Sequence, residues 1–269
     1  MACSRGATLG SPREILELRN RVRLMLLPLN NKVHVLFRRQ DLDMVRLEGK
    51  VVVVLDILFA TSTMVTALAQ GASAVIPTMD GPGAREAAKA LAADSYVLSG
   101  ELLAETIEGF ASPTPLALVK HGVQGRTVVY STTNGTVALK DSSAAPHVFA
   151  GALLNAHAIV KHIAKHHREG TILIVCSGSM GNPNLEDMYG GGYFVDLIAR
   201  ELGEERDLSD AAIAARALYQ SEAPESALLR GRVGQMMVER GLKDEVKFAA
   251  QLSTLDVVPK LVDGVLRPV

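Results

Sequence analysis

Short apolar runs rich in β-branched residues alternate along this chain with stretches of helical periodicity. The clearest run begins with four consecutive valines at Val51–Asp56, which leave no polar face and therefore predict a strand buried on both sides. The predicted strands are Val33–Phe37, Val51–Asp56, Ala74–Pro77, Tyr96–Ser99, Thr127–Tyr130, His147–Gly151, Thr171–Val175, Asp256–Val258 and Val265–Pro268.

The stretches between these strands predict helices. They are Thr61–Gln70, Pro82–Ala93, Pro115–His121, Thr136–Asp141 and Ala156–Glu169, and beyond Leu185 the chain is predicted to be helical through about Phe248. Alternating strands and helices indicate an α/β fold with a largely parallel sheet covered on both faces. Asp263-Gly264, between the last two predicted strands, is typical of a hairpin turn.

Three segments are predicted along the chain. Residues 1–30 form an N-terminal extension, for which a short amphipathic helix beginning at Ser11-Pro12, a mobile appendage and a cleaved leader are alternatives. Glycine and proline cluster between residues 108 and 126, which favours a break there. We therefore expect a first α/β segment at residues 31–120 and a second at residues 121–269 with a helical C-terminal part.

Composition narrows the class of protein. The 269 residues include 28 Lys+Arg and 29 Asp+Glu, so the formal net charge is −1 and no nucleic-acid partner is expected. Two cysteines make no disulfide framework, which favours a reducing, cytoplasmic location. No apolar run approaches the roughly 20 residues that span a bilayer, and no signal peptide is apparent, so no membrane partner is expected. The expected partner is an anionic small molecule.

Ligands of open α/β sheets collect at the carboxyl ends of the strands, so the residues after each strand are candidates for chemistry. Asp56 ends the valine-rich strand, and the hydroxyls of Thr61, Ser62 and Thr63 then open a helix. A carboxylate there suits a divalent cation, and the N–H groups of a helix start suit an anion. The structural alternative is a turn carboxylate and an N-cap.

The loop after Thr127–Tyr130 is Ser131-Thr132-Thr133-Asn134-Gly135-Thr136. Four hydroxyls, an amide and a glycine suit a loop that wraps an oxyanion with side-chain and backbone donors. An N-cap and a turn need only one or two such residues, so we favour an anion-binding function for this loop.

A second loop of this kind follows Thr171–Val175, where Cys176-Ser177-Gly178 precedes the paired carboxylates Glu186-Asp187. The loop suits an anion, and the carboxylates suit a metal. A cysteine-phosphatase loop would require arginine at position 182, where Asn182 stands, so Cys176 is expected to be buried and unreactive.

Glu101 follows Gly100 at the end of another predicted strand. The case for Glu101 as a functional carboxylate is stronger if Asp56 lies beside it, because neighbouring carboxylates attract Mg²⁺ and raise one another's pKa. The central prediction is that Asp56, Glu101 and residues 131–136 converge on one crevice.

In this order the strand-end motifs resemble those of the 2-phosphosulfolactate phosphatase family, often called ComB-like. Asp56 to Thr63 resembles the family signature Asp-Val-Leu-Arg-Ala-Thr-Thr-Thr, and Ser131 to Thr136 contains the family's Thr-Thr-Asn-Gly-Thr motif in full. Further blocks are resembled by Gly100-Glu101, Ile107–Phe110, Leu154–Ala156, Cys176–Gly178 and Glu186-Asp187. The resemblance runs from about residue 33 to residue 200.

The resemblance implies a ComB-like three-layer α/β/α fold of two related halves, with mostly parallel or mixed sheets and an active site between the halves. It implies Mg²⁺-dependent hydrolysis of a phosphate ester on a small sulfonated carboxylic acid, a step towards coenzyme M. We also expect a homo-oligomer.

Residue roles follow from the matched motifs. The resemblance implies catalytic roles for Asp56, Glu101 and Asn134. The implied metal ligands are Asp56, Glu101, Glu186 and Asp187. The candidate substrate-binding residues are Phe59, Thr61, Ser62, Thr63, Ser131, Thr132, Thr133, Gly135, Thr136, Asn155, Cys176, Ser177 and Gly178.

Three departures separate the chain from the family pattern. Phe59 and Leu102 stand where the family has cations, and Ala111 stands where it has an aspartate. Phosphoryl transfer depends on positive charge, so the missing cation at position 59 bears on the activity. Either Phe59 faces the ligand, or a neighbouring arginine such as Arg85 displaces it. Two alternatives therefore stand beside the phosphatase. One is a lyase that decarboxylates a related sulfonated acid such as sulfoacrylate, and the other is a non-catalytic anion-binding protein.

Overall fold

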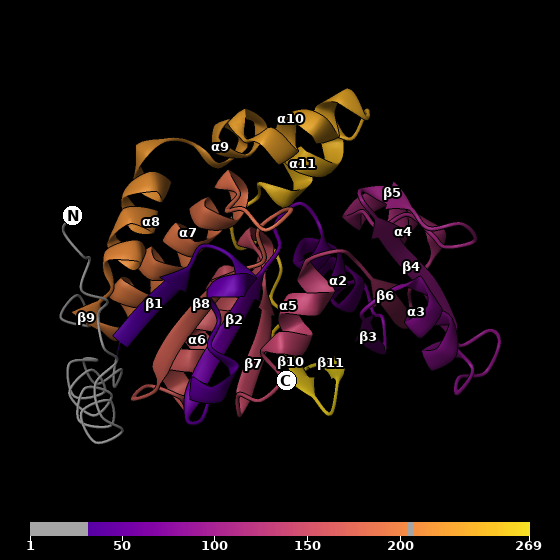
Figure 1. The fold of residues 1–269 in the computed structure, drawn as a ribbon, viewed down its shortest axis with the longest axis horizontal. Helices are drawn as coiled ribbons and strands as arrows, with labels where there is room; N and C mark the ends of the chain where they lie inside the picture. Colours follow the sequence, from indigo (N-terminus) through magenta and orange to yellow (C-terminus); the bar gives the residue numbers. More distant parts are fainter. Residues whose placement is uncertain (1–31, 204–206) are drawn as a thin grey trace, which may run out of the picture. The chain divides into compact units, whose positions relative to one another are not determined.

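The computed structural model describes residues 32–203 and 207–269, so the extension predicted at residues 1–30 lies outside the described residues. Its centre is one sheet of 11 strands in the order β5-β4-β6-β3-β11-β10-β7-β2-β8-β1-β9 (Figure 1). The strands are β1 (Lys32–Leu36), β2 (Lys50–Leu55), β3 (Ala74–Thr78), β4 (Tyr96–Leu102), β5 (Glu105–Thr106), β6 (Thr127–Ser131), β7 (His147–Gly151), β8 (Thr171–Cys176), β9 (Asp207–Leu208), β10 (Pro259–Val262) and β11 (Val265–Pro268).

Two groups of parallel strands make up most of this sheet. β4, β6 and β3 run parallel to one another, and so do β7, β2, β8 and β1. The hairpin of β10 and β11 lies between the groups and pairs antiparallel with β7 on one side and with β3 on the other. Its turn is at Asp263-Gly264, as predicted, and both residues have the positive φ that a tight hairpin turn uses (49° and 78°).

The described α-helices are α2 (Ala60–Ala69), α3 (Gly81–Ala88), α4 (Pro115–His121), α5 (Gly135–Asp141), α6 (Ala156–His166), α7 (Leu185–Leu202), α8 (Asp210–Ser221), α9 (Pro224–Arg230), α10 (Arg232–Glu239) and α11 (Lys243–Ala249). Short 3₁₀ helices occupy Arg39–Asp41, Met44–Arg46 and Leu153–Asn155. Helices cover both faces of the sheet, which confirms the three-layer α/β/α fold (Figure 1). None of the described helices has both the length and the apolarity that crossing a bilayer requires.

The valine run behaves as its pattern predicts. Val51, Val53 and Leu55 of β2 pack into a hydrophobic core shared with α6, α7 and α8, whereas Val52 and Val54 pack into a second core shared with α2, α4 and α5. Successive strand residues point to opposite faces, so this strand is buried on both sides and holds its last residue, and the carboxylate after it, at a fixed place.

The strand predicted at Asp256–Val258 is wrong, because β10 begins three residues after Asp256, at Pro259. The Leu255 N–H donates to the Leu154 carbonyl (2.9 Å), and Asn155 Nδ2 donates to the Val257 carbonyl (3.0 Å). These backbone groups are already paired with the loop before α6, so this stretch does not join the sheet.

Helix α3 ends at Ala88 rather than at the predicted Ala93. The chain beyond it tightens into i→i−3 bonds, with the Lys89 N–H donating to the Glu86 carbonyl (3.1 Å) and the Leu91 N–H donating to the Ala88 carbonyl (3.0 Å). The strands β5 and β9 were not predicted, because two residues are too few to show a period of two.

Strands from both sides of residue 120 interleave in the sheet. β6 lies between β4 and β3, and β2 lies between β7 and β8. The sheet itself does not divide at residue 120, and the two related halves at residues 31–120 and 121–269 stay a prediction.

Glu245 of α11 fixes the C-terminal helices to α4. Its buried carboxylate accepts hydrogen bonds from the Thr114 hydroxyl (2.7 Å) and from the N–H groups of Leu116 (2.8 Å) and Ala117 (2.9 Å). It therefore caps the first turn of α4 from a position 129 residues beyond Leu116.

Replacing Glu245 by alanine is expected to lower the free energy of unfolding by about 2–4 kcal/mol, because hydrogen bonds to charged groups contribute about 1.5–3 kcal/mol and buried donors lose their partner. Urea denaturation measures the change. Glu245→Gln keeps one acceptor oxygen and should lose less. A loss below about 1 kcal/mol in the alanine variant would contradict this role.

Candidate active site

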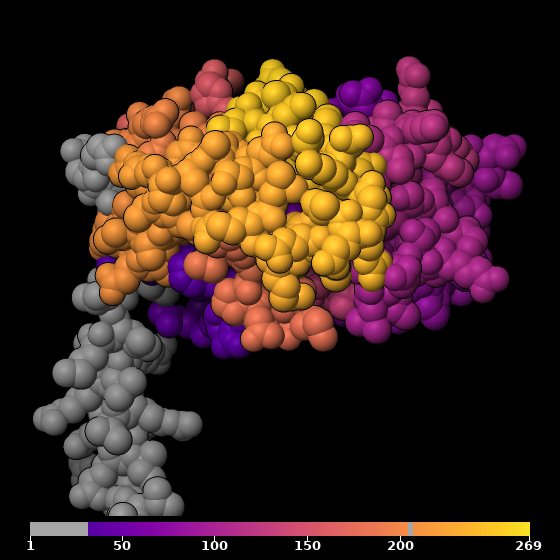
Figure 2. Space-filling model, turned by 90° about the horizontal axis from the view of Figure 1, so that it is seen from above, coloured from indigo at the N-terminus to yellow at the C-terminus, as the bar shows by residue number. Residues whose placement is uncertain are grey.

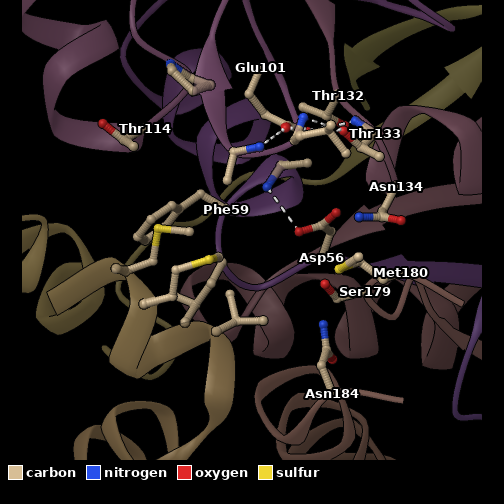
Figure 3. A pocket seen from close by; sticks show the side chains of 18 of the residues that line it. Asp56, Phe59, Glu101, Thr114, Thr132, Thr133, Asn134, Ser179, Met180 and Asn184 are labelled. Atoms are coloured by element: carbon tan, nitrogen blue, oxygen red, sulfur yellow. Dashed lines mark hydrogen bonds between the residues drawn. The ribbon is translucent and has the colours of Figure 1, made fainter. Parts of the chain in front are cut away.

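A cavity of about 300 Å³ opens at the carboxyl ends of the parallel strands (Figure 3). Residues at or after the carboxyl ends of β2, β4, β6 and β8 form one part of its lining, and α10 with Leu242 before α11 forms another. Figure 2 shows the yellow C-terminal helices covering this side beside the magenta segment that contains β4 and α4. Asp56, Glu101 and residues 132–134 all line this one cavity, so the predicted convergence is confirmed.

Asp56 directs its carboxylate into the cavity (Figure 3). Its Oδ1 accepts a hydrogen bond from the Ala60 N–H (3.2 Å) at the start of α2. Burial, and then the charges of Asp187 and Glu101, raise the pKa of Asp56 well above its usual range, while N–H groups of Ala60 and Gly135 oppose this rise. A Cβ on Gly135 would lie 2.7 Å from Asp56 Oδ2, so glycine permits the close approach of this loop.

Glu101 lines the cavity, but its carboxylate oxygens are already hydrogen-bonded. Oε1 accepts from the Thr133 N–H (2.6 Å), and Oε2 accepts from the Ala104 N–H (2.6 Å) and from the Thr133 hydroxyl (3.1 Å). This network joins the turn after β4 to the loop after β6 (Figure 3). The geometry assigns Glu101 to positioning the loop rather than to an open ligand site.

The loop after β6 presents Thr132, Thr133 and Asn134 to the cavity. Thr132 and Thr136 fix its shape, because the Thr136 N–H donates to Thr132 Oγ1 (3.2 Å) and Thr136 Oγ1 donates to the Thr132 carbonyl (2.9 Å). The Asn134 side chain makes no capping bond to α5, and Figure 3 shows its amide at the cavity. This amide is therefore available to a ligand.

The cation of the site comes from the C-terminal helices. Arg232, the first residue of α10, is the one cationic side chain among the described residues that line the cavity. Its Nη2 donates to Ser179 Oγ (3.0 Å) in the loop after β8. Asn184, which also lines the cavity, caps α7 by accepting from the Asp187 N–H (3.2 Å).

Glu186 and Asp187 are buried and do not line the cavity. Asp187 accepts from the N–H groups of Ile57 (2.8 Å) and Gly178 (3.1 Å), whereas neither carboxylate oxygen of Glu186 has a hydrogen-bond partner in the described part of the chain. Burial is the main cause that raises the pKa of Glu186 to about 7 and the pKa of Asp187 to about 8. The charge of Asp56 further raises the pKa of Glu186, and the charge of Glu186 further raises the pKa of Asp187.

In metal-free buffer, stability is expected to fall as the pH rises from 4.5, the ordinary pKa of Glu186, to about 7. Between these values folded Glu186 holds a proton that the unfolded chain has released, so raising the pH favours unfolding. Glu186→Gln should remove up to about 3 kcal/mol of this pH dependence. Urea denaturation between pH 5 and pH 8 in EDTA measures it, with the exposed Glu169→Gln as control. Equal slopes in the two variants would contradict the assignment.

A Mg²⁺ ion fits part of the predicted ligand set. Within residues 32–203 and 207–269, no three His, Cys, Asp or Glu side chains converge closely enough to hold a metal ion by themselves. Proteins often bind Mg²⁺ through one or two carboxylates, with water and substrate phosphate completing the shell. Asp56 suits this mode, because burial and the charges of Asp187 and Glu101 disfavour its ionised form, and a bound cation would favour that form. Glu101 suits it less, because its oxygens already accept three hydrogen bonds.

Several of the predicted hydroxyl ligands bond to the backbone instead of lining the cavity. Thr61 Oγ1 donates to the Asp56 carbonyl (3.0 Å), Ser62 Oγ to the Ile57 carbonyl (2.8 Å) and Thr63 Oγ1 to the Pro113 carbonyl (2.8 Å). The predicted binding residues that do not line the cavity are Thr61, Ser62, Thr63, Ser131, Gly135, Thr136, Asn155, Cys176 and Ser177.

Every member of this group is buried. Asn155 Oδ1 accepts from the Ala152 N–H (2.9 Å) and Nδ2 donates to the Val257 carbonyl, so this side chain joins two loops. Burial and the nearby carboxylates raise the pKa of the Cys176 thiol well above its usual range, which keeps it protonated. The Ser177 hydroxyl has no hydrogen-bond partner among the described residues.

The three residues that depart from the family pattern differ in whether they line the cavity. Phe59 lines the cavity, and so does Leu103, whereas Leu102 and Ala111 do not. Arg85 does not replace the missing cation, because its guanidinium lies over the Phe110 ring (4.8 Å to the centroid) and Nη2 donates to the Glu108 carbonyl (2.6 Å).

The sequence did not predict the wall of the cavity that α10 and the residue before α11 form. It consists of Arg232, Val233, Met236, Met237 and Leu242. The site was predicted from residues that follow strands, whereas Arg232 follows a glycine within a helical stretch. No pattern in the sequence therefore indicated this wall.

The fold and the site together define an α/β enzyme whose pocket gathers carboxylates, amides, hydroxyls and the Arg232 guanidinium at the carboxyl ends of strands from two parallel groups. Residues 37–264 match the family model described as 2-phosphosulpholactate phosphatase, and the chain belongs to this family of phosphatases.

Similar proteins carry names that match this family. The chain is 33% identical over 235 residues (87% of this chain, 98% of the relative) to a "Probable 2-phosphosulfolactate phosphatase" of Clostridium beijerinckii. It is 35% identical to proteins of the same name from Caldanaerobacter subterraneus subsp. tengcongensis, over 82% of this chain and 91% of the relative, and from Carboxydothermus hydrogenoformans, over 85% and 92%.

Proposed function

We propose that this protein hydrolyses a phosphate monoester of the 2-phosphosulfolactate type with the help of Mg²⁺, as a step towards coenzyme M. The convergence of Asp56, Asn134 and Arg232 on one cavity carries the proposal. It is supported by membership of a phosphatase family and by the names of the relatives.

Asp56 would hold the Mg²⁺ ion, which when bound supplies positive charge against the phosphoryl oxygens. The Arg232 guanidinium supplies a second positive charge from α10. Asn134 and the hydroxyl of Ser179 orient the anion between them.

The remaining lining residues prepare the site. Glu101 holds the Thr133 backbone in place, so the donors after β6 need no rearrangement when the anion enters. Phe59 and Met237 exclude bulk water, which strengthens the electrostatic interactions inside the cavity.

Release of inorganic phosphate from 2-phosphosulfolactate tests the function. We expect turnover with Mg²⁺, loss of turnover with EDTA and recovery when Mg²⁺ is restored. Mass spectrometry of the same mixtures, and of sulfoacrylate with the protein, identifies decarboxylation if the lyase alternative is correct. A thermal shift with sulfolactate but no turnover would favour the non-catalytic alternative, and no phosphate release at micromolar protein would refute the phosphatase.

The homo-oligomeric state and the cytoplasmic location belong to this proposal. Size-exclusion chromatography with light scattering measures the first, and a single-chain mass would contradict it. Fractionation of the source cells measures the second.

A further inference from the structure

The turn between β4 and β5 is built from residues that its conformation disfavours. The two strands pair antiparallel with Leu102 opposite Glu105, so Leu103 and Ala104 form a two-residue hairpin turn. Their φ angles are 53° and 65°. Turns with positive φ at both positions strongly prefer Asn-Gly or Asp-Gly, and a leucine at positive φ is uncommon. A strained turn of this kind persists only where contacts from its surroundings hold it.

The β10–β11 hairpin makes a comparable turn from favoured residues. Asp263 and Gly264 form it, with φ angles of 49° and 78°. Glycine adopts positive φ without the steric cost that a Cβ brings. The β4–β5 turn has Ala104 at the position of Gly264, and both Leu103 and Ala104 line the cavity. The less favourable turn is therefore the one that shapes the candidate active site.

Hydrogen bonds join this turn to the loop after β6. The Leu103 N–H donates to Thr133 Oγ1 (3.2 Å), and the Ala104 N–H donates to Glu101 Oε2 (2.6 Å). The other carboxylate oxygen of Glu101 accepts from the Thr133 N–H (2.6 Å; Figure 3). The turn, Glu101 and the loop that presents Asn134 thus form one hydrogen-bonded unit. A shift of the turn would displace the donors that the loop offers to an anion.

Arg240 holds this unit from the C-terminal end of α10. Its Nη1 donates to the Ala104 carbonyl and pairs with Glu105 Oε1 (2.8 Å). Arg240 follows the last residue of α10 and does not itself line the cavity. At the other end of the helix, Arg232 donates to Ser179 in the loop after β8 (3.0 Å). Helix α10 is therefore tied at its two ends to cavity loops from both groups of parallel strands.

We propose that Arg240 is a positioning residue of this active site. It holds the Leu103-Ala104 turn at positive φ, and through Glu101 it fixes the donors of the loop after β6. This inference rests on the proposed phosphatase function and adds a residue to its machinery. Donors that are already in place need no reorganisation in the transition state. Loss of Arg240 therefore lowers kcat more than it raises KM.

Arg240→Met should lower kcat for phosphate release from 2-phosphosulfolactate about tenfold and change KM by less than about threefold. Arg267→Met removes the same charge from an exposed position of β11 and should leave both constants within about twofold. Arg240→Lys keeps the charge and a donor, so it should lose only about threefold in kcat. It replaces the methionine variant if thermal unfolding shows that the latter does not fold. An unchanged kcat in a folded variant at position 240 overturns the proposal.

A glycine at position 104 tests whether Arg240 acts through the turn. Glycine adopts the φ of Ala104 freely, so Arg240→Met/Ala104→Gly should return kcat to within about threefold of the unchanged protein. Arg240→Met/Asp263→Gly adds a glycine at a positive-φ position that does not line the cavity, and it should recover no activity. Equal kcat in the two double variants overturns the proposal.

Hydrogen exchange followed by mass spectrometry reports on the turn without turnover. In Arg240→Met the amides of Leu103 and Thr133 should exchange at least about tenfold faster, and Ala104→Gly should restore their protection. Unchanged exchange overturns the inference and leaves the proposed function standing. If the unchanged protein releases no phosphate, the proposed function fails, whereas faster exchange in Arg240→Met still supports the hold of Arg240 on the turn.

Discussion

Asp56→Asn is expected to abolish phosphate release and at the same time to raise the thermal midpoint. The loss should reach about 10³-fold in kcat, as for removal of a charged group that acts on the reacting phosphoryl group. The gain arises because burial and the charges of Asp187 and Glu101 disfavour the ionised carboxylate. A neutral side chain of the same shape removes this repulsion, with about 1 kcal/mol or more of stabilisation.

Asp94→Asn is the matched control, because Asp94 is exposed and does not line the cavity. It should change neither quantity. Steady-state kinetics and thermal unfolding with and without Mg²⁺ make the comparison, and the stabilisation by Mg²⁺ should disappear only in Asp56→Asn. A variant at position 56 that keeps a tenth of the activity, or that unfolds at a lower temperature, contradicts the assigned role.

Arg232→Met is expected to lower kcat/KM about 10²-fold or more, because it removes the cation that lines the cavity and is proposed to bind the phosphate, and it keeps an apolar side chain of similar length. Arg232→Lys keeps the charge but not the planar fork, so it should recover only part of the loss. The guanidinium also lowers the pKa of Glu186. In Arg232→Met the pKa of Glu186 should therefore rise. Stability should then continue to fall up to a higher pH than in the unchanged protein.

Arg267→Met in β11 provides the control for loss of one positive charge, because Arg267 is exposed and does not line the cavity. Its kcat/KM should match that of the unchanged protein. If Arg232→Met and Arg267→Met have equal kcat/KM, Arg232 does not bind the phosphate.

The parts of the site that the sequence predicted are those attached to strands with a strong pattern. Val51–Asp56 is buried on both faces, so the position of Asp56 at the sheet edge follows from the valine run. The loop after β6 follows the carboxyl end of its own strand and lines the same cavity, although β6 runs opposite to β2, so the meeting of the two loops depends on how the two groups of strands are arranged. Glu101 was predicted from its place at the end of another strand, and its position on the same cavity as Asp56 is confirmed.

The parts that the sequence did not predict depend on packing between distant segments. Whether a hydroxyl such as Thr61 or Ser62 faces a ligand or a carbonyl is decided by where the neighbouring backbone runs, and a motif looks the same in both cases. Arg232 and Met237 of α10 line the cavity, and the neighbouring α11 is held to α4 by Glu245, which stands 129 residues beyond Leu116. No local pattern encodes that contact.

The place of the β10–β11 hairpin affects how the protein is made. This hairpin comes after every other strand in chain order, yet it lies between β3 and β7 and is the element that joins the two parallel groups. During synthesis, each group has its own strands before residue 259 leaves the ribosome, but the edges of β3 and β7 then present unpaired backbone groups to other chains. Until the hairpin pairs with both strands, these two edges are open to mispairing with other chains, and chaperone binding at that stage should protect them.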